Sequence, residues 1–208
     1  MKSIAIGGMG LSGSTLCYNI FRVIRDNSEL DYEIHKIHEY NTYAEISKTI
    51  FMVRDLRDTV ASMLRKDPKR WNGDVEEASK YQMMWYYDTW KDAKKDIIWR
   101  YEDYKSNPYE YVNKVNLELG INLPMDFIKQ VVDVCEGIKD MNIPTHQDKL
   151  ETSEEAILWE ATKMSKRHIT NGGKIGGYKD YLTEEQIRFI ESKYKYFFEE
   201  QNYKLDYK

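Results

Sequence analysis

The sequence of 208 residues predicts an α/β fold, a three-layer sandwich with a central, mostly parallel sheet. Short apolar runs alternate with amphipathic stretches of helical length, the order expected when helices cover both faces of a parallel sheet. The run 48–53 is rich in β-branched and aromatic residues, as a strand buried on both faces requires. A glycine-rich stretch joins the first apolar run to the first helical one. No repeat or interdomain linker interrupts the chain, so we expect a single domain over 1–208.

The expected strands share a short apolar or alternating pattern: they are residues 3–8, 32–38, 48–53 and 96–101. The expected helices share apolar residues at helical spacing: they are residues 14–26, 56–65, 75–94, 108–119, 124–136, 153–166 and a last one that begins at 183. Pro68 stops the second helix, and Pro108 suits the first turn of the fourth, which Gly120 ends. Thr183 and Gln186 have the spacing of a capping box.

The composition is that of a globular protein, with 32% charged and 41% hydrophobic residues. A net charge of −4 argues against a broad nucleic-acid interface. Cys17 and Cys135 are far apart and in no metal-like spacing, which suits a reducing compartment. The segment 1–8 is too short for a signal peptide, and no apolar run approaches the ~20 residues of a membrane span. We therefore expect a cytoplasmic protein with no metal, membrane or nucleic-acid partner.

The segment Gly8–Thr15 is a glycine loop between a strand and a helix, which presents backbone N–H groups and a helix dipole to a phosphate. It nearly matches G-x-x-x-x-G-K-[ST], but Ser14 stands where a nucleotide triphosphatase has its lysine. The pattern predicts a P-loop NTPase-like fold and argues against ATP or GTP hydrolysis. A small P-loop metabolite kinase is the less favoured alternative for the function. For the loop itself, the alternative is an ordinary tight turn that binds no ligand.

A second anion site is indicated by Arg54, which ends the apolar run 48–53, and by Ser62, eight residues later. A guanidinium fork suits a phosphate dianion. The alternative is a helix-capping or ion-pairing arginine. Two separate phosphate sites on one nucleotide restrict the ligand sharply.

Four segments resemble, in the same order, the motifs of sulfotransferases that use 3′-phosphoadenosine 5′-phosphosulfate (PAPS). Residues 12–15 resemble the 5′-phosphosulfate loop, and residues 53–62 the 3′-phosphate motif. Residues 99–108 are similar to the family's L-R-Y-E-D-L…D-P segment, and residues 173–183 to its late G-K-x-G-D-W loop. The resemblance implies PAPS as donor, its product PAP (adenosine 3′,5′-bisphosphate), and a hydroxyl or amine of a small molecule or glycan as acceptor.

The resemblance also implies the site residues. The nucleotide-binding ones are Gly10, Leu11, Ser12, Gly13, Ser14, Thr15, Leu16, Arg54, Ser62, Tyr101, Gly173 and Lys174. Tyr101 is expected at the adenine, and Lys174 is expected to close over the nucleotide. Lys36-Ile37-His38 resembles the family's K-T-H stretch, so His38 is the expected general base with Lys36 on the same strand face. A solvated surface histidine is the alternative for His38.

Three of the departures from the family's pattern bear on the nucleotide site. Leu11 replaces the basic residue that normally neutralises charge on the bridging oxygen, and Leu16 replaces an aromatic that stacks on adenine. Residues 170–172 stand where an Arg-Lys pair often lies. A non-catalytic PAP- or PAPS-binding protein therefore stays an alternative. The acceptor is not identified, because aromatic residues in the variable segments can line a cleft or pack in the core: Trp71, Trp85, Tyr86 and Trp159.

Overall fold

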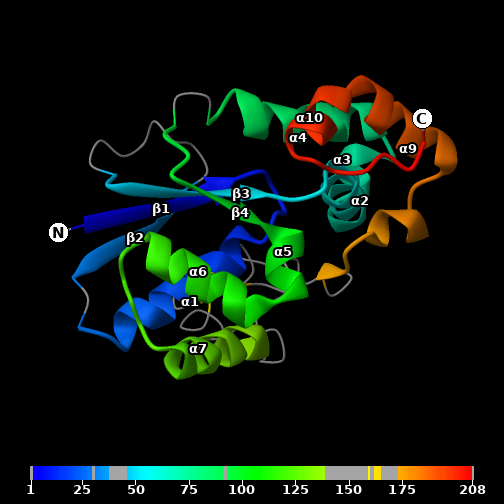
Figure 1. The fold of residues 1–208 in the computed structure, drawn as a ribbon. Coiled ribbons are helices and arrows are strands. Elements are labelled where there is room, and N and C mark those ends of the chain that lie inside the picture. Colours follow the sequence, from blue (N-terminus) through cyan, green and yellow to red (C-terminus); the bar gives the residue numbers. More distant parts are fainter. Residues whose placement is uncertain are drawn as a thin grey trace.

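The computed structural model describes residues 2–29, 31–37, 46–90, 93–138, 159, 162–164 and 173–207. Its centre is a four-stranded sheet of β1 (Lys2–Gly8), β2 (Tyr32–Lys36), β3 (Lys48–Val53) and β4 (Ile97–Arg100), in the order β2-β1-β3-β4. All three strand pairs are parallel. The predicted α/β sandwich is confirmed, and within the described residues its sheet is parallel throughout rather than mostly parallel (Figure 1).

Helices cover both faces of this sheet (Figure 1). One face carries α1 (Ser14–Asp26), α6 (Pro108–Glu118) and α7 (Met125–Gly137), with the short α5 (Tyr101–Ser106) directly after β4. The other layer contains α2 (Leu56–Lys66), α3 (Pro68–Trp71), α4 (Val75–Tyr87), the 3₁₀ turn η5 (Gly177–Asp180), α9 (Glu184–Lys193) and α10 (Lys195–Glu200). The last three bring the C-terminal part of the chain onto α2 and α4.

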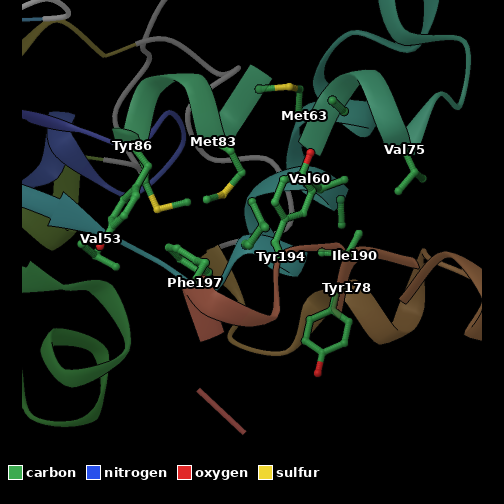
Figure 2. Packing of buried hydrophobic residues seen from close by; sticks show 14 of the residues in the cluster. Val53, Val60, Met63, Val75, Met83, Tyr86, Tyr178, Ile190, Tyr194 and Phe197 are labelled. Atoms are coloured by element: carbon green, nitrogen blue, oxygen red, sulfur yellow. The ribbon is translucent and has the colours of Figure 1, made fainter. Parts of the chain in front are cut away.

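The two cores follow from the alternation of side chains along the strands. Ile4 and Ile6 of β1 pack with α1 and α7, whereas Ala5 faces the layer of α2 and α4. In β3, Phe51 and Val53 join the second core. Figure 2 shows that core at close range, with side chains from β3, α2, α4, α9 and α10 interleaved. Each face of the sheet is thus buried by its own set of helices.

Several element boundaries differ from those that the sequence predicts. The helix expected over 75–94 ends at Tyr87, because Trp90 turns back into the core and is fully buried. A Cβ on Gly7 would lie 2.2 Å from the Trp90 ring, so the indole packs directly on the backbone of β1. The short helices α3 and α5 were not predicted, and the helix expected from residue 183 is divided at Tyr194 into α9 and α10. The predicted helix 153–166 lies largely outside the described residues.

A buried ionic cluster fastens the C-terminal segment to α2. Arg57 pairs with Asp55, at 2.6 Å between Nη2 and Oδ2, and also with Glu191 of α9. Glu191 in turn accepts hydrogen bonds from the backbone N–H groups of Asp206 and Tyr207, at 2.8 and 3.0 Å. The cluster lies directly beside the start of α2, where Arg54 is held.

Candidate functional site

The loop between β1 and α1 has a fixed shape. The N–H of Met9 donates to the carbonyl of Met52 at 3.1 Å, and the Ser12 hydroxyl donates to the carbonyl of Met9 at 2.5 Å. Gly13 has a φ of +92° as the residue before α1, and no side chain of the described residues caps that helix. The first N–H groups of α1 therefore have no intrahelical partner, and the helix dipole adds positive potential there. This is the geometry of an anion cradle.

Tyr101 connects the first loop to the late segment. Its hydroxyl donates to the carbonyl of Gly173 at 3.0 Å. A Cβ on Gly13 would lie 2.8 Å from the tyrosine ring, and a Cβ on Gly173 would lie 2.0 Å from its hydroxyl. Both glycines also have a positive φ, which side chains rarely adopt. The two glycines are therefore needed where they stand, one on each side of the same ring.

Arg54 follows β3 directly and is 6% exposed. Its Nη1 donates to the carbonyl of Leu11 at 3.2 Å and its Nη2 to the carbonyl of Lys174 at 3.1 Å. The guanidinium lies over the Tyr101 ring, 4.4 Å from its centroid. Its buried Nε has no hydrogen-bond partner among the described residues. Arg54 thus joins three segments that are distant in the sequence and keeps one donor available.

Asp58 and Ser62 extend this arrangement along α2, since residues four apart lie on one face of a helix. Asp58 accepts the N–H groups of Gly176 and Tyr178 at 2.8 and 2.9 Å, which fixes the late segment over α2. Burial raises the pKa of the Asp58 carboxyl, against the opposing effect of Arg54. The Ser62 hydroxyl is buried one turn further on, 3.5 Å from Nη2 of Arg65.

Lys36 ends β2 and reaches the start of α1, where its Nζ donates to the Thr15 hydroxyl at 2.7 Å. Burial lowers its pKa to about 8, and the charges of Lys66 and Lys163 add to the effect. The expected base, His38, lies outside the described residues. The side chain of Lys174 is 55% exposed, and its ammonium pairs with Asp180 at 2.5 Å, so it is the backbone carbonyl of Lys174 that reaches Arg54.

The predicted positions Leu11 and Leu16 pack against different cores. Leu11 has a left-handed φ of 58° and packs against the core under α2 and α4. Leu16, in α1, packs against the core on the other face of the sheet. Trp71 and Tyr86, which the sequence leaves open between cleft and core, are buried in the core.

One polar group beside the loop is not among the predicted site residues. Gln82 of α4 is buried next to Gly10. In the sequence it could have been recognised as a glutamine between Ala78 and Tyr86, which lie on the buried side of the same helix. Glu102 of α5 accepts the backbone N–H of Asp55 at 2.9 Å, so it links the end of β4 to the end of β3.

No group of three His, Cys, Asp or Glu among the described residues is arranged to hold a metal ion. None of the helices in the described ranges is both long and apolar enough to cross a bilayer.

Comparison with known proteins gives the family. The sulfotransferase domain model matches residues 42–205. Among solved structures, the crystal structure of mouse sulfotransferase SULT7A1 complexed with PAP superposes with a TM-score of 0.60 at 14% sequence identity. That match covers 92% of this chain and 82% of the mouse protein, and at this identity it shows a shared fold. No curated protein sequence shows significant similarity to the chain. Because the family model spans most of the sequence, the chain belongs to the sulfotransferase domain family, whose sulfate donor is PAPS.

Proposed function

We propose that this protein transfers a sulfuryl group from PAPS to a hydroxyl or amine of a small-molecule or glycan acceptor. The observation that carries the proposal is the contact set of Arg54. Through it, the anion cradle before α1, the aromatic ring after β4 and the late segment meet at the carboxyl ends of the strands. Ligands of open α/β sheets bind at that edge.

The residues present fit a nucleotide with anions on both sides of its ribose. In our assignment the N–H groups of Gly13, Ser14 and Thr15 hold the 5′-phosphate. Arg54 and Ser62 hold the 3′-phosphate. The free Nε of Arg54 and the uncapped N-terminus of α1 support this, because both are donors that a phosphate would satisfy.

The chemistry follows from these positions. PAPS, when bound, supplies a sulfur whose bond to the 5′-phosphate oxygen can break. The acceptor oxygen forms a bond to sulfur while its proton passes to the imidazole of His38, and the electron pair of the broken bond stays on the departing phosphate. We assign Lys36 to neutralise that charge in place of the cation that Leu11 does not provide, since its ammonium already lies at Thr15. Arg22 is not suited to this role because it pairs with Asp26 at 3.0 Å.

A second candidate function is nucleotide binding without turnover. Leu11 favours it, because its uncharged side chain packs against the core where the family has a basic residue. The two functions differ in whether labelled sulfate moves. Incubation with [³⁵S]PAPS and a panel of phenols, sugars and amines is expected to give a labelled product, and His38→Ala is expected to abolish it. Tight PAP binding with no labelled product from any acceptor would favour the binding-only function.

Donor identity has a separate test. Because ligands stabilise the state that binds them, PAP should raise the melting temperature, whereas ADP and Mg²⁺-ATP should not. A magnesium-dependent shift with ATP would instead indicate a kinase.

We also propose a cytoplasmic location, as the two free, buried cysteines suggest a reducing compartment.

A further inference from the structure

Gln82 of α4 is fully buried, and neither its Oε1 nor its Nε2 has a hydrogen-bond partner among the described residues. A buried, unpaired amide destabilises a folded protein, and native proteins contain few of them. On the same stripe of the helix, Ala78 and Tyr86 pack in the core. A leucine or methionine at position 82 would fill this place without the penalty. The glutamine therefore needs an explanation outside the packing of the ligand-free protein.

The amide lies against the loop that forms the anion cradle. A Cβ built on Gly10 would lie 3.2 Å from Oε1 and 3.3 Å from Nε2 of Gln82. Gly10 is three residues before Gly13, and its lack of a side chain allows the amide to approach the loop. The ammonium of Lys36 approaches the same cradle at Thr15. Two polar groups from different elements thus flank the loop, and only the amide lacks a partner.

We propose that the Gln82 carboxamide contacts both reactants: its Nε2 donates to a sulfuryl oxygen of PAPS, and its Oε1 accepts from a second O–H or N–H group of the acceptor, next to the reacting group whose proton passes to His38. The inference rests on the function proposed above and names a further residue of that same site. A sulfuryl group only accepts hydrogen bonds, so it satisfies Nε2 and leaves Oε1 for a donor. A second O–H or N–H group of the acceptor is that donor, because the proton of the reacting group goes to His38. One amide then holds both reactants, and its neutral N–H supplies a contact where Leu11 supplies none.

The experiment compares PAPS with PAP, which lacks the sulfuryl group, by calorimetric titration without acceptor. Gln82→Met is expected to lower the affinity for PAPS about tenfold, the effect of a lost hydrogen bond to a charged group. The affinity for PAP should stay within twofold. The melting temperature of the free protein should rise by about 2 to 4 °C, because an unpaired buried amide has been removed. A merely structural glutamine would lower it.

Gln201 provides a matched control. It is also a buried glutamine, but its amide is partnered: Nε2 donates to the Tyr86 hydroxyl, and Oε1 accepts from Arg100 at 3.0 Å. Gln201→Met should therefore lower the melting temperature and leave the ratio of PAPS to PAP affinity unchanged. The pair of variants separates loss of a reactant contact from loss of a core hydrogen bond.

The acceptor contact is measured in the labelled-transfer assay. Gln82→Met should reduce kcat/KM by at least about a hundredfold, more than its effect on PAPS binding, since the acceptor loses a contact as well. A loss no larger than that in PAPS affinity would remove the acceptor from the proposal. An unchanged ratio of PAPS to PAP affinity, or an equal loss for both nucleotides, would overturn the sulfuryl contact. If the unaltered protein binds neither nucleotide, the proposed function itself fails.

Discussion

Nucleotide binding should be coupled to proton uptake at Lys36, and the number of protons taken up follows from the lowered pKa of this lysine. Burial holds the pKa of this ammonium at about 8 in the free protein. At pH 8.5 only roughly a quarter of the molecules then carry the proton. A phosphate in the cradle beside Thr15 would return the pKa towards 10.5 or above, because an opposite charge favours the ammonium. PAP binding should therefore take up ~0.7 proton at pH 8.5, whereas at pH 6.5 Lys36 is already charged and should itself take up almost none.

The assay is isothermal titration of PAP in buffers that differ in ionisation enthalpy, whose slope gives the number of protons. The phosphates themselves have lost their protons well below pH 8.5. Lys36→Met should abolish the uptake at pH 8.5 and weaken binding most at pH 6.5 to 7.5, where the lysine is charged. Absence of uptake at pH 8.5, or equal uptake in the variant, would refute a buried lysine beside the phosphate.

The same lowered pKa has a consequence for folding. Between pH 8 and 10.5 the unfolded chain keeps a proton that folded Lys36 has released, so the free energy of unfolding gains a positive contribution as pH rises. This contribution is at most about 3 kcal/mol. Urea denaturation should show it as a difference in pH dependence between the unaltered protein and Lys36→Met, and parallel profiles would contradict it.

Three further substitutions, with Gly120→Ala as a control, test other parts of the protein. Arg54→Ala should weaken PAP binding by ~2–3 kcal/mol, the scale of a charge-assisted contact. AMP, which has no 3′-phosphate, should bind as before, so an equal loss for both would contradict the assignment. Gly173→Ala forces a Cβ to 2.0 Å from the hydroxyl that bonds its carbonyl, and should cost PAP affinity. Gly120→Ala has a similar φ of +72° with open space around it, so it should cost only ~1–2 kcal/mol of stability and no affinity. Glu191→Ala leaves Arg57 with Asp55 as its close partner and removes the acceptor of the Asp206 and Tyr207 N–H groups, so it should lower the unfolding free energy in urea by ~3–5 kcal/mol.

Much of the fold could be predicted because its signals are local. The bounds of β3 and α1 agree with the expected 48–53 and 14–26, and the predicted capping box of Thr183 and Gln186 is present. Alternation and helical spacing act within a few residues, so they can be read without knowing the neighbours. The helix expected over 75–94 is longer than α4 because the point where α4 ends is not a local property of the sequence. Its end depends on Trp90 reaching the backbone of β1, a contact between distant parts of the chain.

The candidate site divides in the same way. The glycine loop is a local pattern, so the sequence alone determined that such a loop joins β1 to α1, and its role as a phosphate cradle stays our proposal. The partners of Arg54 were decided only by the tertiary structure, which brings carbonyls 43 residues before it and 120 residues after it to one guanidinium. So were the pKa of Lys36 and the unpaired amide of Gln82. Burial and hydrogen bonding depend on which elements pack together, and no pattern within a short window of sequence specifies that.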